Sequence, residues 1–231
     1  TNVISGRNAQ GKTNLLEAVY MLSCGRSFRT RFDRELTGFG YSAAEILAEV
    51  TSHDRDQTIR IIMQPGTAKK ITVNGVRKSA AELSEVINAV LFCPDDLNLI
   101  KEGAAVRRRL LDNAISQIRP RYAELLSDFN KLYENKSRIL KDWHEKPSLL
   151  DALDEFSDAM CRGSAQLIRY RAAFAARLDE AARPIHSEFS GSGEKLEIKY
   201  KTVSTVKNVY SSAKEIYYDC LLYTSDAADD R

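Results

Sequence analysis

The chain begins with a mixed pattern of apolar and polar positions that predicts alternating strands and helices. Val3-Ile4 is a short apolar run typical of a strand, and apolar residues then recur at helical spacing over residues 14–22. Three later segments are rich in residues that favour strands: 45–51, 58–63 and 70–73. Asn74-Gly75 follows them and is a strong hairpin signal. This part of the chain therefore predicts a strand, a helix and an antiparallel meander.

Two shorter elements are predicted next. Ser79 is followed three residues later by Glu82, which makes a capping box, so we expect a short helix over residues 79–87. Residues 89–93 are apolar apart from the cysteine that ends them, and they predict a buried strand.

The segment Pro94-Asp95-Asp96 after this strand has two interpretations. One is a Walker B motif, an apolar strand that ends in an acidic Mg²⁺ ligand, here Asp95 or Asp96. The other is a turn after a proline, in which an aspartate caps the next segment. The residues alone leave both open.

Helical spacing dominates the second half of the chain. It runs from residue 106 to 132 and again from 149 to 185, with a break at residues 143–147. Pro120 is expected to divide the first stretch or to occupy the first turn of a second helix. Two long helices with a short connection predict an antiparallel helical lobe. Residues 195–203 then alternate, which predicts a strand.

The composition is that of an ordinary globular protein, with 43% hydrophobic and 29% charged residues among 231. No apolar run approaches the roughly 20 residues of a membrane span. The four cysteines are far apart and the three histidines are scattered, which favours reduced cytosolic thiols and no metal cluster. A net charge of +2 is compatible with a phosphate-rich partner but does not demonstrate one.

The most specific motif is Gly6 to Thr13, which matches the P-loop pattern G-x-x-x-x-G-K-[ST] at every specified position. Lys12 is expected between the β- and γ-phosphates of ATP, and the Thr13 hydroxyl is expected to bind Mg²⁺. The alternative is a surface turn that contains glycine. The expected nucleotide-binding residues are Gly6, Arg7, Asn8, Ala9, Gln10, Gly11, Lys12, Thr13 and Asn14.

Two groups of arginines are candidates for contacts with phosphate or DNA. Gly25 can end the first helix, and four arginines follow within nine positions, among them Arg26 and Arg29. Arg107, Arg108 and Arg109 fan around roughly 200° of a helix, so at least one is expected near a lobe boundary. For both groups the alternative is a solvated basic surface.

These patterns divide the chain into four parts. Residues 1–103 form a nucleotide-binding lobe with the P-loop and a β-layer, and residues 104–188 form the helical lobe. Residues 189–218 are expected to return as one or more strands to the first lobe. Residues 219–231 have no assignment and could be a non-native tail.

Five segments in this order resemble the bacterial RecF family, over about residues 1 to 210. They are the P-loop, Gly25-Arg26-Ser27-Phe28-Arg29-Thr30, Leu91-Phe92-Cys93-Pro94-Asp95-Asp96-Leu97, Arg107-Arg108-Arg109-Leu110-Leu111-Asp112 and Pro120-Arg121-Tyr122. The resemblance implies an α/β fold, a P-loop ABC-type ATPase head similar to those of SMC and Rad50 proteins, with an added antiparallel β-layer and a helical lobe. It places Asp95 at a junction between lobes rather than in Walker B.

The resemblance also implies a function. Members of the family are ATP-dependent DNA-binding proteins of recombinational repair, replication-fork maintenance and the SOS response. ATP drives head dimerisation on duplex DNA or on junctions of single and double strands, and RecO and RecR are partners in loading RecA. A cytoplasmic protein without a membrane partner is expected.

The chain departs from the family pattern by omission. The ABC signature and the true Walker B strand, which normally follow the helical lobe, are absent, as is the first strand before Thr1. We therefore expect a chain truncated at both ends that binds ATP but does not hydrolyse it alone, and no catalytic residue is identified. Two alternatives remain: a P-loop kinase or other NTPase, and a non-hydrolysing interaction module.

Overall fold

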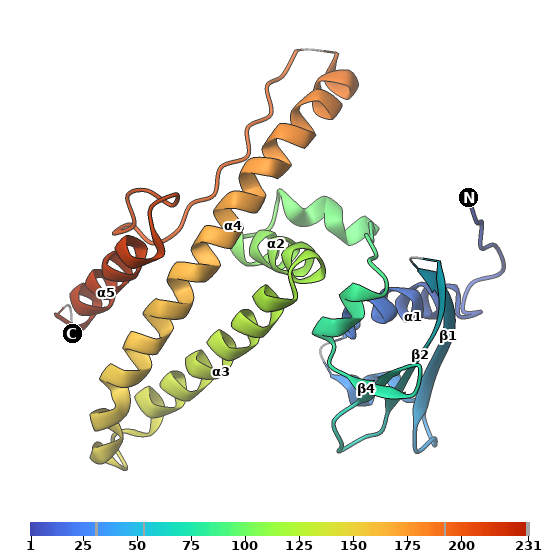
Figure 1. Cartoon of the computed structure of the whole chain (residues 1–231), viewed down its shortest axis with the longest axis horizontal. Helices are drawn as coiled ribbons and strands as arrows, with labels where there is room; N and C mark the ends of the chain where they lie inside the picture. The colour runs from blue at the N-terminus through green and yellow to red at the C-terminus, as the bar shows by residue number, and fades with distance from the viewer. Residues whose placement is uncertain (31, 53, 192, 230–231) are drawn as a thin grey trace. The chain divides into compact units, whose positions relative to one another are not determined.

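The computed structural model describes residues 1–30, 32–52, 54–191 and 193–229, which divide into two compact units (Figure 1). Unit 1 comprises residues 1–107 and 116–120, and unit 2 comprises residues 108–115 and the described residues from 121 onward. Helix α2 (Ala104–Ile118) contributes residues to both units.

Unit 1 contains helix α1 (Lys12–Cys24) and a four-stranded antiparallel sheet. The strands follow one another in space as β1 (Ala44–Ser52), β2 (Arg55–Met63), β3 (Lys70–Val73) and β4 (Val76–Lys78). The predicted meander is therefore confirmed. Asn74 and Gly75 link β3 to β4 with φ values of 51° and 79°, a left-handed pair typical of a tight hairpin turn.

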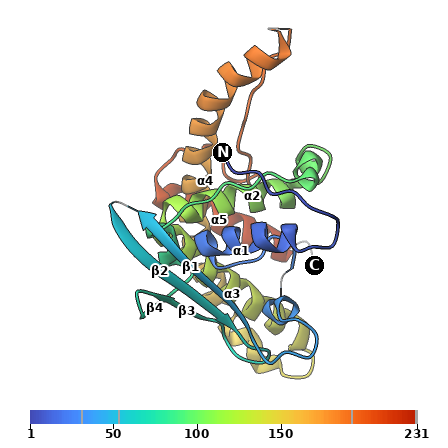
Figure 2. The ribbon, with the colours of Figure 1, turned by 90° about the vertical axis from the view of Figure 1, so that its right-hand side faces the viewer.

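The core of unit 1 forms between α1 and one face of the sheet (Figures 1 and 2). Met21 and Leu22 of α1 pack with alternate residues of β2 and β3, including Ile59, Ile61 and Ile71. Each such buried aliphatic side chain contributes about 1.5–3 kcal/mol to folding. Gly25 ends α1, as expected: its φ is 64° and its N–H donates to the Met21 carbonyl at 2.7 Å.

Two strand predictions in unit 1 are wrong. Neither Val3-Ile4 nor residues 89–93 form a strand, and neither pairs with another strand within the described residues. Val90 is 101% and Phe92 74% exposed, so the second segment is not buried either. An apolar run shows that a segment can be buried, whereas a strand also needs a neighbour with which to share hydrogen bonds.

The predicted capping box at Ser79 is only half formed, because the Ser79 hydroxyl donates to Glu82 instead of accepting its N–H, and the helix is of the 3₁₀ type. The Glu82 carboxylate accepts the Ser79 N–H at 2.7 Å and its hydroxyl at 2.8 Å. The helix η2 spans Ala81–Glu85, and two more 3₁₀ helices, η1 (Asp33–Leu36) and η3 (Pro94–Leu99), lie in this unit.

Unit 2 is helical. After α2 it contains α3 (Pro120–Asp142), η4 (Pro147–Ala152), α4 (Leu153–Ser190) and α5 (Ala213–Asp229). Pro120 occupies the first position of α3, where its missing N–H costs no helical hydrogen bond. In the described part of the chain, no helix combines the length and the apolarity of a membrane span.

Helices α3 and α4 pack side by side and antiparallel, as predicted (Figure 1). A Cβ at Gly163 of α4 would lie 3.4 Å from Phe129 of α3, and the Lys136 ammonium donates to the Ser157 hydroxyl at 2.8 Å. Residue numbers therefore rise along one helix as they fall along the other. Helix α5 packs on α4, where Ile216 and Cys220 are buried, so residues 219–229 continue a helix.

The strand predicted over residues 195–203 is also wrong. The segment has no regular secondary structure, and its Ile198 N–H donates to the Asp179 carboxylate of α4 at 2.7 Å. Leu196, Ile198 and Tyr200 are half-buried while their neighbours are exposed. The alternation therefore indicates that one side of this extended segment is buried, and here it is buried against helix α4 and not in a sheet.

Candidate nucleotide-binding site

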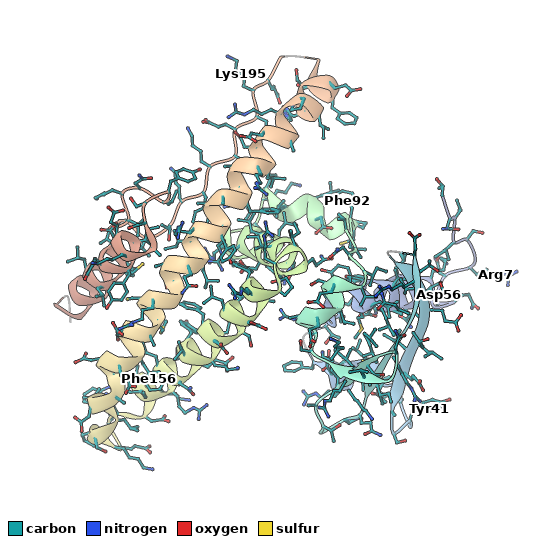
Figure 3. All side chains as sticks on the ribbon, in the orientation of Figure 1. Arg7, Tyr41, Asp56, Phe92, Phe156 and Lys195 are labelled. Carbon is teal, nitrogen blue, oxygen red and sulfur yellow. The ribbon has the colours of Figure 1, made fainter. Side chains whose placement is uncertain are left out.

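The P-loop joins the extended residues 1–7 to the first turn of α1. Gly6, Ala9 and Gly11 have φ values of 154°, 62° and 82°, so the loop turns through conformations that favour glycine. Ala9 adopts this region without being glycine, a strain typical of functional loops. Figure 3 shows Arg7 projecting away from the rest of unit 1, and its side chain is exposed.

The start of α1 is arranged to receive an anion. Gly11 supplies no capping side chain, and no acidic residue lies in the first turn. The first helical hydrogen bond joins the Leu15 N–H to the Gly11 carbonyl at 3.0 Å, so the amides of Lys12, Thr13 and Asn14 have no acceptor within the helix. These donors and the positive end of the helix dipole fit a phosphate group.

Lys12 holds its ammonium at this loop. Its Nζ donates to the carbonyls of Gly6 at 2.8 Å and Arg7 at 2.6 Å. Within the described residues it makes no ion pair with a carboxylate, so its charge is not neutralised by the protein. A cation that only backbone carbonyls hold can exchange them for the stronger interaction with phosphate oxygens.

One residue of the loop has the chemistry and the position to bind a metal ion. Thr13 is exposed at the first turn of α1, where its hydroxyl suits a Mg²⁺ ion that shares phosphate oxygens. Among the described residues, no group of three or more His, Cys, Asp or Glu side chains could hold a metal ion. The magnesium fit therefore depends on Thr13 and on the nucleotide itself.

A buried carboxylate ties the basic loop after α1 to the P-loop helix. Glu17 is 6% exposed, and it accepts hydrogen bonds from the Ser27 hydroxyl and from Arg29 Nη1 at 3.2 Å. The same Arg29 nitrogen donates to Asn14 Oδ1 at 2.8 Å. The ring of Phe28 packs edge-on against Tyr20, with centroids 5.8 Å apart.

No local pattern in the sequence indicates this network. The one sequence feature that could have indicated it is Glu17, a glutamate on the apolar face of the predicted helix. The partners of Glu17 lie ten and twelve residues further along the chain. Of the two candidate arginines in the loop, Arg29 is engaged by Glu17 and Asn14, whereas Arg26 is exposed. Both stay predictions as phosphate or DNA contacts.

The arginines of α2 differ in how they are used. Arg107 Nη1 donates to the carbonyls of Glu102 at 2.7 Å and Leu99 at 3.2 Å, which fixes the turn before the helix. Arg108 and Arg109 are exposed. They make no ion pair within the described residues and remain candidates for contacts with phosphate.

The structure favours the turn interpretation at Asp96. The Asp96 carboxylate accepts the Cys93 N–H at 2.7 Å and caps the helix η3, as the turn interpretation predicted. The side chain of Asp95 lies outside the described residues. Because its carboxylate is occupied by a cap, Asp96 serves as a structural residue here.

Comparisons with known proteins point in one direction. No family model matches the chain. It is 38% identical over 202 residues to the DNA replication and repair protein RecF of Agathobacter rectalis, covering 87% of this chain and 56% of the relative. It is 34% identical over 220 residues to the RecF protein of Clostridioides difficile, covering 90% and 58%.

A solved structure gives the same result. The recombination mediator protein RecF of the RecFOR pathway, in a structure described as RecF-ATPrS, matches with a TM-score of 0.88 and 32% identity. The match covers 97% of this chain and 61% of that chain. A second structure, described as RecF-ATP, matches with a TM-score of 0.82. The chain thus spans somewhat more than half the length of the curated relatives it matches.

Proposed function

The chain belongs to the RecF family and has the α/β fold of its ATPase head, and from this premise we propose that residues 6–14 bind the phosphates of ATP. The observation that carries the proposal is the loop itself. Its left-handed turns precede a helix start without a cap, and Lys12 contacts only carbonyls of the loop. The related RecF structures described with ATP and ATPrS support it.

Each residue has a role in this proposal. The first-turn amides of α1 donate to phosphate oxygens, the Lys12 ammonium offsets their charge, and the Thr13 hydroxyl is one ligand of Mg²⁺. Bound Mg²⁺ would supply charge neutralisation on the phosphates. Asn14 is held by Arg29 and thereby connects the phosphate loop to the basic loop after α1.

For the whole protein, the family relationship supports a role in recombinational DNA repair and replication. We propose that ATP binding drives dimerisation of two heads on duplex DNA, in the cytoplasm, with RecO and RecR as partners in loading RecA. Two observations are consistent with this: the names of the relatives, and the RecFOR pathway in which the related structures stand.

The test is the Lys12→Met variant of the full-length protein. It should weaken ATP binding by roughly 10- to 100-fold, because a hydrogen bond to a charged group contributes about 1.5–3 kcal/mol. It should also abolish nucleotide-driven dimerisation, measured by analytical ultracentrifugation. Lys101→Met is the matched control, since Lys101 is an exposed lysine of the same unit. Unchanged ATP affinity in Lys12→Met would contradict the proposal.

Residues 1–231 alone are proposed to bind ATP without turning it over. A phosphate-release assay on this chain, with ATP binding measured in parallel, checks it. Steady release of phosphate would overturn the proposal.

A further inference from the structure

The sheet of unit 1 has a second face, which points away from α1 and is here called the outer face. Residues that alternate with the buried core reach it. Arg60 of β2 pairs with Thr72 of β3, and Thr72 pairs with Arg77 of β4. Lys70 lies two residues before Thr72 and therefore on the same face. Three cationic residues thus surround Thr72.

This arrangement forms a shallow cavity. It has a volume of about 210 Å³ and is lined by Thr58, Arg60, Ile62, Lys70, Thr72 and Gly75. Neighbouring strands lie about 4.8 Å apart, so the backbones that carry Arg60 and Arg77 are about 10 Å apart, with Thr72 between them. The lining offers cations and hydroxyl groups but no aromatic ring and no side-chain amide.

The three cations differ in what holds them. Arg60 Nε donates to Glu45 Oε1 at 2.5 Å, and both side chains are about half exposed. Lys70 and Arg77 are exposed and have no hydrogen-bond or ion-pair partner in the part of the chain that the structure describes. Their charge is available to a ligand.

Carboxylates share this face but lie toward one edge of the sheet. Glu45 and Glu49 are on β1. Asp56 is on β2, where it lies opposite Thr51 of β1. Positive charge therefore concentrates over β3 and β4, and negative charge over β1. A polyanion would contact the β3–β4 side and be repelled from β1.

We propose that Arg60, Lys70 and Arg77 on the outer face contact the phosphate backbone of duplex DNA. The inference rests on the proposed function. The surface it names includes none of the arginines that the sequence suggested as candidates for contacts with phosphate or DNA. One strand of a duplex carries a charge about every 3.4 Å along the axis, so a cationic row about 10 Å wide faces about three phosphates. A contact made to phosphate oxygens alone carries no sequence information, so it is independent of DNA sequence.

The experiment measures binding of a 30-base-pair duplex by the full-length protein with ATP, at several salt concentrations. The double variant Lys70→Ala/Arg77→Ala should bind roughly tenfold more weakly, and its slope of log affinity against log salt should fall by up to about 2, since each phosphate contact contributes about 0.9. ATP affinity should not change. Lys70→Arg/Arg77→Lys keeps both charges and should retain the slope.

Arg55→Ala is the matched control, because Arg55 is an exposed arginine of β2 whose register places it on the opposite face from Arg60. It should leave the slope unchanged. If the wild-type protein does not bind the duplex at all, the proposed function fails. If the wild type binds and the double variant keeps the wild-type slope, the inference alone is overturned. If the double variant loses binding to a polyglutamate peptide but keeps the wild-type DNA slope, the inference is also overturned, and the surface would instead fit an acidic protein partner.

Discussion

A buried cluster in unit 2 and the P-loop of unit 1 use their charged residues in opposite ways. In unit 2, Arg171 of α4 makes two hydrogen bonds to Asp112 of α2, at 2.7 and 2.9 Å, and both side chains are no more than 15% exposed. The Tyr122 hydroxyl also donates to Asp112. In unit 1, Lys12 contacts only carbonyls of its own loop. A charged side chain that is paired with an opposite charge inside the protein stabilises the fold. A charged side chain without such a partner can bind a ligand.

The cluster in unit 2 shows its coupling in the pKa values. Burial lowers the pKa of Arg171, but the hydrogen bond to Asp112 and the nearby charges raise it by more, so the net direction is upward. Burial also raises the pKa of Tyr122, as does its hydrogen bond to Asp112. The arrangement keeps Arg171 charged and Tyr122 protonated, which is the state that joins α2, α3 and α4.

The largest expected effect comes from breaking this cluster. Arg171→Met leaves the Asp112 carboxylate buried without its cation, and it should lower the free energy of unfolding of unit 2 by about 3–5 kcal/mol. The only tryptophan, Trp143, lies in unit 2, so its fluorescence during urea unfolding reports this unit. ATP binding in unit 1 should be unchanged in native buffer.

The matched control is Arg162→Met on the same helix. Arg162 pairs with Asp158 at 2.8 Å, but its side chain is 70% exposed, so the pair is screened by water. We expect no resolvable shift of the unfolding midpoint. Equal destabilisation by the two variants would show that burial does not distinguish the pairs, and it would remove the contrast between structural and available charges.

The fold could be predicted wherever the signal is local. Gly25, Asn74-Gly75 and Pro120 each act on the backbone of their own turn, and each marks an element boundary in the structure. Pairing of strands is not local. The apolar run at residues 89–93 and the alternation at 195–203 predicted segments with a covered face, but no sequence pattern shows which neighbour supplies the cover.

The same division applies to the candidate site. The P-loop could be read from residues 6–13 because its glycines, lysine and threonine act within one turn of the chain. The bonds from Ser27 and Arg29 to Glu17 could not, because they depend on how the loop after α1 folds back along the helix. The cations around Thr72 required the register of three strands.

A smaller effect is expected from the glycines that shape unit 1. Gly25 has a φ of 64°, and a Cβ there would lie 2.8 Å from the Cβ of Ala80. Gly25→Ala should therefore cost about 2–4 kcal/mol, from left-handed strain and from overpacking against Ala80. Hydrogen exchange of the Ile59 and Ile61 amides measures this in unit 1.

Gly75→Ala is the matched comparison, since its φ is 79° but a Cβ would meet nothing within 4 Å. It should cost only the backbone strain, about 1 kcal/mol. The difference between the two variants isolates the close contact of Gly25 with Ala80. Equal costs for the two variants would mean that steric overlap at Gly25 does not affect the stability of unit 1. As a control in unit 2, the fluorescence of Trp143 should respond to neither variant.

The smallest effect concerns a surface carboxylate of unit 1, and it shows how an exposed pair differs from the buried one. Hydrogen bonds from the Lys78 ammonium and from the Ser79 N–H lower the pKa of Glu82 to about 2 from 4.5. Because the pKa is lower in the folded state, the ionised carboxylate stabilises unit 1 fully above about pH 4.5, and this contribution is lost as the pH falls toward 2. The side chains are 33% and 37% exposed, so water and salt weaken the pair.

Glu82→Gln should therefore flatten the acid side of the stability profile of unit 1 and leave its value near pH 2 unchanged. Hydrogen exchange of the β2 and β3 amides between pH 2 and 5, corrected for intrinsic rates, measures the profile. Glu49→Gln is the control, since the Glu49 side chain is exposed and makes no hydrogen bond or ion pair among the described residues. If both variants flatten the profile equally, the acid sensitivity arises from net charge. Only the hydrogen bonds and the ion pair of Glu82 distinguish it from Glu49, so the proposed cause requires a difference between the two variants.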